Sequence, residues 1–466
     1  IVSDFFYPNL GGVEGHISEI SALLVAPPFN HHVVIITHAY APSRIGVRHL
    51  STGVTVYYLP LKVIASQATL PNFFTSHPLL RYIFIRERIQ LVHAHQALSS
   101  LAHEALFHAR EAGIKTVFTD HSLFSLDEDA ASILTNKLLR FVLSDVDRVV
   151  CVSYAARENT VLRAGIRDPG RRVVVIPNAV DGEKFKPLTL KEQSTRSTTI
   201  VILSRLMYRK GIDLLIEAIP RICLAHPEVD FLIGGDGPKR VELEQMRERC
   251  LLLDRVQLVG SVKQGSVRDH LTRGEIFLSP SLTEAFGTSL IEAASCGLLI
   301  VATEVGGVPE ILPSPEMLLL AAPNTDELVR VVSLAVHRVR TQLESGDWDP
   351  WAVHARTRGM YSWSEVVRRL EGVYFEAMRE RRVSRMERLM RYWDNAGPET
   401  GGVFCIVVMV DMVFAWLLEW GWPKADIDVV LPVAPGVASE TASEEEEEAH
   451  VWNGDEDRRG RTTGND

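Results

Sequence analysis

The chain contains two successive series in which short apolar, β-branched runs alternate with segments of helical periodicity. The runs of the first series lie at residues 31–40, 89–95, 115–122, 147–154 and 171–178, and those of the second at 199–205, 229–238, 255–260, 275–281 and 298–304. Such alternation is typical of parallel α/β architecture, in which each strand is followed by a helix that covers the sheet. We therefore expect two Rossmann-like domains, each with its own sheet, and a ligand-binding cleft between them.

A polar stretch that contains Pro, Ser and Thr separates the two series at residues 186–199. We expect this stretch to link an N-terminal domain over residues 1–185 to a C-terminal domain over residues 200–350. A closing helix and a basic juxtamembrane segment then occupy residues 351–400. Residues 1–8 resemble the end of a strand already under way, so we expect further residues to precede them.

An apolar segment at residues 401–422 is long enough to span a bilayer, although it contains Asp411 and Glu419. Three tryptophans near its end fit an interfacial belt. We expect Asp411 to pair with a partner helix, because a charge at this depth needs one. The alternative is a buried core helix.

Charge is distributed unequally about this apolar segment. Six arginines lie between Arg379 and Arg391, whereas only Lys424 precedes the acidic residues of the tail at 423–466, which we expect to be disordered. The positive-inside rule then predicts that both α/β domains are cytosolic and that the tail crosses the membrane.

Composition excludes some classes of protein. The net charge of −10 comes mainly from residues 440–457, which hold nine acidic residues and no Lys or Arg. The rest is nearly neutral and has no basic stripe interleaved with aromatic residues, so a nucleic-acid partner has no support. The cysteines are scattered, without CxxC spacing, which argues against a disulfide framework or a zinc site and for a reducing compartment: Cys151, Cys223, Cys250, Cys296 and Cys405.

The stretch LTEAFGTSLIEAASCG places Glu284 and Glu292 eight positions apart at the turn from a strand to a helix. Gly287 permits close approach of a ligand to the backbone, Thr288 can cap the helix, and the free N–H groups and helix dipole suit a phosphate. Carboxylates bind hydroxyl groups, so a nucleotide sugar, with phosphates between two polyols, fits this arrangement. The alternative is that the helix dipole alone favours both glutamates.

Basic residues and glycines follow two other strands of the second series. Arg205 and Lys210 lie after one strand and before a helix that begins near Gly211, where they suit a diphosphate leaving group. Isolated basic residues of this kind are otherwise solvated surface charges. Gly235 belongs to a glycine-rich turn after the next strand and is expected near the phosphates.

In the first series, Gly11 and Gly12 lie between the first strand and the first helix, a position where a phosphate can approach the backbone. The spacing differs from the GxGxxG pattern of dinucleotide folds, which disfavours a nicotinamide enzyme. His121 follows a strand next to Asp120 and is placed to contact a sugar in the cleft, although a single histidine can equally be structural.

The stretch EAFGTSLIE matches the E-x7-E motif of retaining glycosyltransferases with the GT-B fold, family 4. More closely, the chain resembles the catalytic subunits of phosphatidylinositol N-acetylglucosaminyltransferases, the PIG-A type, in SDFFYPNLGGVEGHI, VFTDHSLF, VIPNAVD, SRLMYRKGIDLL and SLTEAFGTSLIEAASCGL. The resemblance covers residues 1–400 densely and extends to the single C-terminal span.

This resemblance implies a GT-B fold with an N-terminal acceptor domain and a C-terminal nucleotide-sugar domain. It implies transfer of N-acetylglucosamine from UDP-GlcNAc to phosphatidylinositol on the cytosolic face of the endoplasmic reticulum, the first step of glycosylphosphatidylinositol (GPI) anchor synthesis. It also implies other subunits as partners, no cofactor and no metal. Retention is expected by a front-face route in which the departing phosphate assists deprotonation of the acceptor hydroxyl.

The resemblance also implies roles for individual residues. It assigns Glu284 and His121 to the donor sugar and Glu292 to the ribose. It assigns Arg205 and Lys210 to the diphosphate. Gly12 falls in the phosphate region of the cleft.

Three alternatives stay open. A GT-A transferase would use a metal-binding DxD motif, whose spacing occurs at Asp127 and Asp129, Asp145 and Asp147, and Asp347 and Asp349. The second pair precedes a strand and is poorly placed for a metal at a strand's carboxyl end. The other two alternatives are a non-catalytic membrane subunit and a GT-B enzyme that acts on another lipid.

Overall fold

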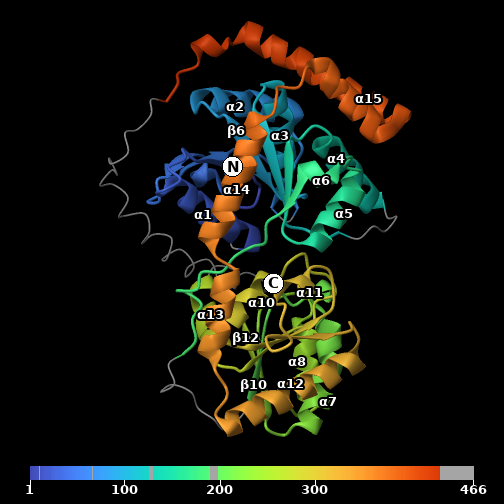
Figure 1. The fold of residues 1–466 in the computed structure, drawn as a ribbon. Coiled ribbons are helices and arrows are strands. Elements are labelled where there is room, and N and C mark those ends of the chain that lie inside the picture. The colour runs from blue at the N-terminus through green and yellow to red at the C-terminus, as the bar shows by residue number, and fades with distance from the viewer. Residues whose placement is uncertain (10, 66, 125–129, 189–197, 431–466) are drawn as a thin grey trace, which may run out of the picture.

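The computed structural model describes residues 1–430 except 10, 66, 125–129 and 189–197, and these form two α/β domains stacked one above the other (Figure 1). Each domain has its own largely parallel sheet, so the predicted pair of Rossmann-like domains is confirmed. Most of the expected linker at 186–199 and nearly all of the acidic tail lie outside the described residues.

The N-terminal sheet is assembled around the first residues of the chain. Val2 forms parallel bridges to Ile36 and Ala94, which joins two groups of strands into one sheet. Apolar side chains cover both faces, as a parallel sheet between helices requires. The strands are β1 (Val34–His38), β2 (Gly46–His49), β3 (Thr55–Leu59), β6 (Leu91–His95), β7 (Lys115–Asp120), β8 (Arg148–Cys151) and β9 (Val173–Val175), with a small hairpin of β4 (Val63–Ala65) and β5 (Ala68–Thr69).

Helices cover this sheet in the order that the alternating pattern predicts. They are α1 (Gly12–Val25), α2 (Phe73–Arg86), α3 (Ser100–Glu111), α4 (Ala130–Leu143), α5 (Tyr154–Ala164) and α6 (Pro169–Arg172). Two of them have side-chain caps that the sequence supplies: Ser99 accepts a hydrogen bond from Ala102 N at the start of α3, and Ser153 accepts one from Ala156 N at the start of α5.

The C-terminal sheet is entirely parallel. Its strand order is β12 (Val256–Gly260), β11 (Val229–Gly234), β10 (Thr198–Leu203), β13 (Ile276–Ser279), β14 (Leu299–Thr303) and β15 (Leu318–Ala321). Its helices are α7 (Ile212–Ala225), α8 (Arg240–Arg249), α9 (Val267–Leu271), α10 (Thr288–Ser295), α11 (Val308–Ile311) and α12 (Thr325–Ser345), with short 3₁₀ turns η3 (Tyr208–Lys210) and η4 (Gln264–Ser266).

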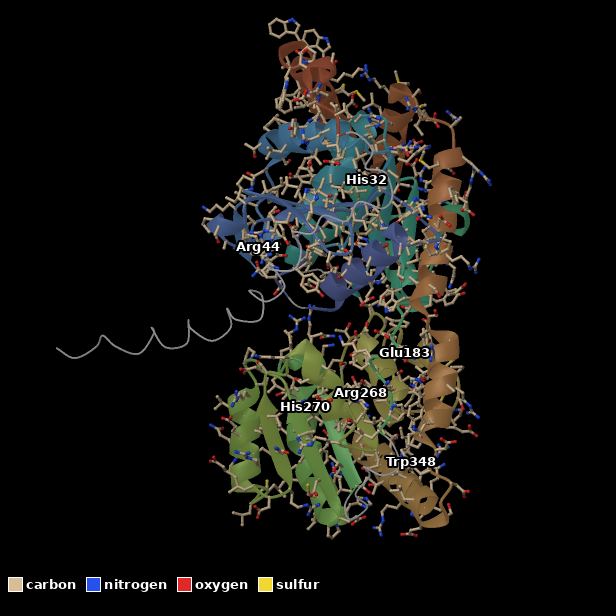
Figure 2. All side chains as sticks on the ribbon, turned by 90° about the vertical axis from the view of Figure 1, so that its left-hand side faces the viewer. His32, Arg44, Glu183, Arg268, His270 and Trp348 are labelled. Atoms are coloured by element: carbon tan, nitrogen blue, oxygen red, sulfur yellow. The ribbon has the colours of Figure 1, made fainter. Side chains whose placement is uncertain are left out.

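Two helices return the chain from the C-terminal to the N-terminal domain. Helix α13 (Pro350–Met360) packs on α10, and α14 (Trp363–Arg379) packs on α1 and β7. Figure 2 shows both helices along one side of the molecule, with Glu183 at the level where the domains meet. An ion pair of 2.8 Å joins Glu183 to Arg358 of α13. The expected closing segment therefore consists of two helices that bind the domains together.

The last helix, α15 (Arg385–Gly421), is longer than the expected span at 401–422. It bends at Gly397, whose φ of 78° and ψ of 177° are not helical, immediately before Pro398. The helix is long and apolar enough to cross a membrane, and only 22% of its most apolar window is buried, so it is not a core helix. In Figure 1 it lies across the N-terminal domain next to α2.

Asp411 of α15 is buried against the N-terminal domain, where its Oδ1 atom lies 3.0 Å from His77 Nδ1 and 2.9 Å from His108 Nδ1. The expectation that Asp411 pairs with a partner helix is therefore confirmed. The chain supplies the partners itself, because α2 and α3 present two histidines where α15 crosses them.

Candidate functional site

The C-terminal sheet changes direction between β10 and β13. The chain runs outward from β10 through β11 to β12, and then returns to the other side of β10 with β13. In open α/β sheets, ligands bind at the carboxyl ends of the strands beside such a switch. The segment after β10 carries Arg205 and Lys210, and the loop after β13 carries Glu284. The topology therefore brings these three predicted site residues to one place.

Lys210 and Glu284 form a direct ion pair. The Lys210 Nζ donates to Glu284 Oε2 over 2.6 Å, and the side chains are 27% and 18% exposed. The two loops are held together by a hydrogen bond of 2.9 Å from Leu282 N to Arg209 O. Gly211 is required here, because its φ is +70° and a Cβ atom would lie 1.8 Å from Pro280 O. The pair is thus rigidly placed and still reachable from solvent.

Gly235 shapes the loop that carries Arg205. Its φ is +136°, and a Cβ atom would lie 1.8 Å from Ser204 O, so only glycine allows the loops after β10 and β11 to pack. Gly235 was expected to lie near the phosphates. The structure shows that it also allows the two loops to pack against each other. Arg205 itself is exposed and faces Glu14 of the N-terminal domain closely enough to interact with it electrostatically.

The start of α10 differs in one detail from the expectation. Gly287 is the N-cap residue with φ +87°, Thr288 is the first helical residue, and no side chain caps the helix among the residues that the structure describes. Thr288 therefore does not cap α10, because it lies one position too far along the chain. Its Oγ1 instead lies 3.5 Å from Asn178 Nδ2, which comes from the N-terminal half of the chain.

Glu292 lies on the second turn of α10 in an environment unlike that of Glu284. Burial raises the pKa of Glu292 to about 7, and the Lys184 ammonium partly offsets this rise. Its charge is therefore only weakly compensated, which is typical of a group that awaits a ligand. The two glutamates are thus placed differently: Glu284 is ion-paired ahead of the helix and Glu292 is largely enclosed within it.

His121 belongs to a cluster of imidazoles. Its Nε2 lies 3.1 Å from His95 Nδ1, and its ring centroid lies 4.6 Å from that of His16. Burial lowers the pKa of His16 to about 4 and places those of His95 and His121 well below their usual range, so all three rings are neutral at pH 7. His121 can therefore donate or accept a hydrogen bond at a sugar hydroxyl but carries no charge.

Asp120, the neighbour of His121, stabilises the local fold. Its carboxylate accepts hydrogen bonds from Ser122 N and Oγ through Oδ1 and from Thr160 Oγ1 through Oδ2. The Asn178 side chain instead connects the histidines to the C-terminal domain, because it lies close enough to His16 to influence its pKa and approaches Thr288. The predicted residues of both domains are thus linked through Asn178, which the sequence did not single out.

The two glycines of the turn before α1 have different surroundings. Among the residues that the structure describes, a Cβ atom on Gly12 would meet no atom within 4 Å, whereas one on Gly11 would lie 2.4 Å from Glu14 Oε2. Glu14 is buried beneath the turn and accepts a hydrogen bond of 2.7 Å from Asn9 Nδ2. Burial raises the pKa of Glu14, and the facing Arg205 guanidinium counteracts part of the rise. Packing therefore does not demand glycine at position 12, so the space above it is open to a ligand.

Sequence reasoning missed a loop of the C-terminal domain that supports Glu284. The Gly307 N–H donates to Glu284 O over 3.0 Å, and a Cβ atom on Gly306 would lie 2.2 Å from the same oxygen. Glu310 accepts hydrogen bonds from the N–H groups of Tyr154 and Ala155 and so caps α5 of the N-terminal domain. The glycine pair before Val308 and Pro309 was the available signal for this loop.

The two DxD pairs within the described residues form other contacts. Asp127 and Asp129 lie outside the described residues. Asp349 caps α13 by accepting from Ala352 N, and Asp347 accepts from Ser345 Oγ. Asp347 and Asp349 therefore do not support the GT-A alternative.

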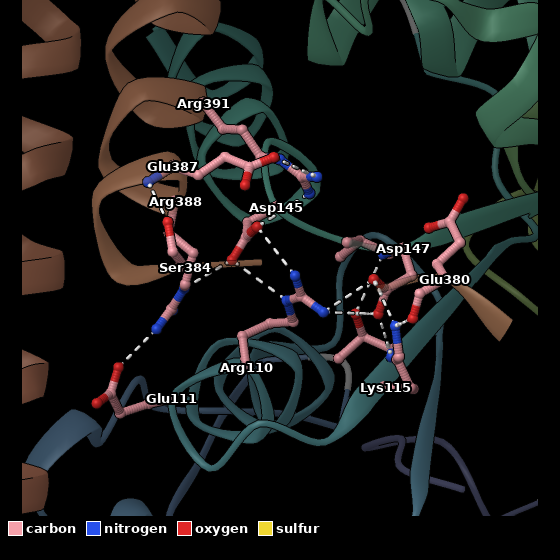
Figure 3. A network of polar contacts seen from close by, with 12 residues as sticks. Arg110, Glu111, Lys115, Asp145, Asp147, Glu380, Ser384, Glu387, Arg388 and Arg391 are labelled. Carbon is pink, nitrogen blue, oxygen red and sulfur yellow. Dashed lines mark hydrogen bonds and ion pairs between the residues drawn. The ribbon is translucent and has the colours of Figure 1, made fainter. Parts of the chain in front are cut away.

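Asp145 and Asp147 belong to a network of arginines at the start of α15 (Figure 3). Arg110 bridges both carboxylates, at 3.2 Å to Asp145 Oδ1 and 2.7 Å to Asp147 Oδ2. Arg388 donates from Nε to Asp145 Oδ2 over 2.8 Å. Arginine nitrogens already occupy the positions where a metal would bind, so this pair is structural.

Comparison with known proteins places the chain among glycosyltransferases. Residues 38–128 match the family model described as PIGA (GPI anchor biosynthesis), and residues 189–342 match that of glycosyl transferases group 1. The chain is 49% identical over 433 residues to the phosphatidylinositol N-acetylglucosaminyltransferase gpi3 subunit of Schizosaccharomyces pombe, which covers 92% of the chain and 91% of that relative. It is 46% identical to the corresponding subunit of the same enzyme from Homo sapiens, over 92% of the chain and 87% of the relative.

Solved structures show the same fold at low sequence identity. Anabaena HepE in complex with UDP superposes with a TM-score of 0.62 at 17% identity, over 80% of this chain and 99% of that one. Sucrose-phosphate synthase from Thermosynechococcus elongatus superposes with a TM-score of 0.62 at 21% identity, over 78% and 93%. These likenesses confirm the expected GT-B fold.

Proposed function

The chain belongs to the PIG-A/GPI3 family of phosphatidylinositol N-acetylglucosaminyltransferases, and from this membership we propose that it transfers N-acetylglucosamine from UDP-GlcNAc to phosphatidylinositol with retention of configuration. It is a glycosyltransferase of GPI-anchor biosynthesis, and the proposed reaction is the first step of that pathway. The observation that carries the proposal is the similarity to named relatives over 92% of the chain. The geometry at the sheet switch point supports it.

The diphosphate of the donor is assigned to Arg205, Lys210 and the start of α10. An ammonium and a guanidinium beside uncapped helical N–H groups form a site for two phosphates. In the free protein Lys210 is neutralised by Glu284 at 2.6 Å. A bound diphosphate attracts Lys210 and releases the Glu284 carboxylate, which then accepts hydrogen bonds from the sugar hydroxyls. Donor binding and formation of the sugar subsite are therefore coupled through one ion pair.

The remaining predicted residues are assigned around this centre. Glu292 binds the ribose, since its weakly compensated carboxylate gains hydroxyl donors there. Neutral His121 is assigned to the transferred sugar from the opposite domain, and Gly12 leaves room at the phosphates, whereas Gly11 makes room for Glu14. The departing phosphate takes the proton of the acceptor hydroxyl on the same face, so the product keeps the donor's α configuration.

The test is to incubate membranes that contain the protein with labelled UDP-sugars and phosphatidylinositol, and to identify the glycolipid by mass spectrometry and by cleavage with a phosphatidylinositol-specific phospholipase. We expect label only from UDP-GlcNAc, in a lipase-sensitive product with an α linkage. Label in a lipase-resistant lipid would identify another acceptor, and a β linkage would overturn retention. Membranes with Lys210→Met protein are the control for endogenous activity.

Membrane attachment is proposed through α15, with both domains cytosolic at the endoplasmic reticulum and the acidic tail lumenal. Of the basic run, Arg379, Arg381, Arg382 and Arg385 are exposed, so they remain available to favour the cytosolic side. The relatives are named as subunits, so we expect further subunits as partners.

Protease added outside sealed microsomes should digest the domains and leave a tail epitope intact. Protection of the domains, or digestion of the tail without detergent, would contradict this orientation.

A further inference from the structure

The backbone of the loop that carries Glu284 is held from both domains. The Glu284 carbonyl accepts a hydrogen bond of 3.0 Å from Gly307 N, within the C-terminal domain. The next carbonyl, that of Ala285, accepts one of 2.6 Å from Ser153 Oγ, which belongs to the N-terminal domain. Ser153 and Ala285 are 2% and 7% exposed, so water does not compete for this bond. The position of Glu284 therefore depends on both domains.

Ser153 uses both bonding functions of its hydroxyl group. The oxygen accepts a hydrogen bond of 3.0 Å from Ala156 N at the start of α5, while the proton is donated to Ala285 O. Because a carbonyl oxygen can only accept, the Ser153 proton is directed across the boundary between the domains. One side chain therefore caps α5 and supports the loop of Glu284.

Two glycines make room for this contact. A Cβ atom on Gly307 would lie 2.2 Å from Ala285 O and 2.7 Å from Ser153 Oγ. One on Gly306 would lie 2.8 Å from Leu123 Cδ2, in the segment that follows β7 of the N-terminal domain. The glycine pair therefore lets the N-terminal domain approach the loop of Glu284 closely.

Glu310 makes a second contact between the same parts of the two domains. Its Oε2 accepts a hydrogen bond of 2.6 Å from Tyr154 N, and its Oε1 accepts one of 2.8 Å from Ala155 N. These N–H groups lie in the first turn of α5, where the helix dipole also favours a carboxylate. Glu310 belongs to α11, directly after the glycine pair, so it attaches the supporting loop to the N-terminal domain.

The chain passes between the two domains twice, once between β9 and β10 and once between α13 and α14. Domains that are joined by few segments commonly rotate about them as hinges. Each of the contacts made by Ser153 and Glu310 has one partner in either domain. Separation of the domains would therefore break both contacts and leave the loop of Glu284 without its support from α5.

We propose that Ser153 and Glu310 are positioning residues of the transfer reaction, which hold Glu284 in its reactive place only while the domains are in contact. The inference rests on the proposed role of Glu284 at the donor sugar. Ser153 acts directly on the backbone next to Glu284, and Glu310 acts through the loop at 304–311. Glu284 is thus fully positioned only after the N-terminal domain, which we expect to hold the acceptor, has closed on the donor.

The first experiment measures kcat and UDP affinity in membranes with normal protein levels. Ser153→Ala and Glu310→Ala should each lower kcat about tenfold, as expected for loss of a buried or charge-assisted hydrogen bond that orients a reacting group. UDP affinity should stay within about twofold of the wild type, because the sugar subsite and not the nucleotide is affected. Glu310→Gln, which retains one acceptor oxygen, should lose less than Glu310→Ala.

Asp349→Ala is the control for these variants. It removes a carboxylate that caps α13 by accepting from Ala352 N, but this bond does not cross between the domains. We expect kcat and UDP affinity of Asp349→Ala to equal those of the wild type. Wild-type kcat of both Ser153→Ala and Glu310→Ala would overturn the proposal.

A double-mutant cycle tests whether Ser153 acts through Glu284. In the Glu284→Gln background, Ser153→Ala should lower the residual kcat less than about threefold, because the carboxylate that it positions is already absent. A full tenfold loss in this background would mean that Ser153 acts only by capping α5, and would overturn its role at Glu284.

A third measurement requires no turnover, so it is independent of the proposed function. Fluorophores on exposed Cys250 of the C-terminal domain and on Leu162→Cys of α5 report the distance between the domains by energy transfer, with Cys405→Ser to prevent labelling there. Combined Ser153→Ala and Glu310→Ala should increase the fraction of molecules with separated domains. Distance distributions identical to those without the two substitutions would overturn the proposal, whereas transferase activity of the wild type tests the proposed function separately.

Discussion

Charged side chains gather at two places in this molecule, the donor site and the network at the start of α15, and they are used in opposite ways. At the donor site, Lys210 and Glu284 form a single pair and keep 27% and 18% of their surface exposed. In the network, Asp145 is fully buried and accepts from Arg110, Arg388 and a further arginine. A charged group with access and spare bonding capacity is available to a ligand, whereas a saturated one holds elements together.

The acidic groups of the two regions show the same difference in their protonation. Burial alone would raise the pKa of Asp145, but the Arg110 and Arg388 guanidinium groups hold it below its usual value. Burial raises the pKa of Glu292 to about 7, because Lys184 compensates it only in part. An under-compensated carboxylate is a common mark of a functional site. The comparison teaches that burial matters less than whether partners saturate the buried group.

The largest expected effect tests the conclusion that the network at the start of α15 is structural. Asp145→Ala leaves the arginines buried without their anion, and breaking a buried ion pair in this way costs about 3–5 kcal/mol. We expect this loss in the free energy of unfolding by denaturant titration in detergent. Asp269→Ala, at an exposed aspartate of α9, should change little. Normal stability of Asp145→Ala together with lost UDP binding would place Asp145 in the donor site.

The next largest effect tests the conclusion that Lys210 of the donor site is functional. Lys210→Met removes a charge that stabilises the departing diphosphate, and loss of one such group typically lowers turnover by about 10²–10³-fold. The melting temperature should stay unchanged, since the site is only partly buried. Lys239→Met is a matched control, because Lys239 also pairs with carboxylates and has a similar exposure of 24%. A large drop in stability of Lys210→Met without loss of turnover per folded molecule would make the pair structural.

A smaller effect separates the two glutamates within the site. Glu292→Gln removes charge-assisted hydrogen bonds worth about 1.5–3 kcal/mol each, and because ribose contacts hardly change during reaction, UDP affinity should fall. Glu284→Gln should chiefly lower kcat, because sugar contacts follow the charge that develops at the anomeric carbon. Calorimetry with UDP and initial rates distinguish the two. The reverse pattern would exchange the assignments, and wild-type behaviour of both would remove these glutamates from the site.

The smallest effect is a pH dependence that comes from Glu292. Its pKa in the folded protein is raised to about 7 from the ordinary 4.5. Protonation is therefore favoured by folding, and this contribution to stability is full below pH 4.5 and is lost as pH rises to about 7. UDP affinity should show the opposite trend and increase up to tenfold per pH unit below that pKa, because the ionised carboxylate accepts the ribose hydroxyls.

Glu292→Gln provides the control for this pH dependence, since UDP itself titrates in the same range. The difference between wild type and variant isolates the contribution of the carboxylate. Parallel pH profiles of UDP affinity in the two proteins would show that Glu292 is ionised throughout or does not meet the ligand.

Much of the donor half of the site was predictable from local pattern. Every strand of the C-terminal sheet except β15 was predicted as an apolar run, and loops at the carboxyl ends of neighbouring parallel strands must meet. Arg205, Lys210 and Glu284 follow such strands, so their convergence required only the correct strand order. The helix start was also foreseen, although Gly287 rather than Thr288 occupies the N-cap position.

Other contacts were beyond local pattern because their partners are distant in sequence. Asn178 approaches Thr288 across 110 positions, and Glu310 caps α5 from 155 and 156 positions away. Asp145 matched a DxD spacing, and only its arginine partners show that its role is structural. The six arginines from Arg379 to Arg391 were interpreted as a signal of membrane topology. One of them, Arg388, is instead buried between Glu111 and Asp145.

The sequence by itself determined the two α/β domains, the glycosyltransferase family, the residues at the sheet switch point and an apolar helix long enough to cross a membrane. These depend on periodicity and on short motifs, which act over a few residues. Only the tertiary structure decided which charged groups are saturated, which glycines are required by backbone contacts, and that Asp411 meets His77 and His108. Saturation and burial depend on atoms brought together from 303 positions away in the chain, and no local pattern encodes that proximity.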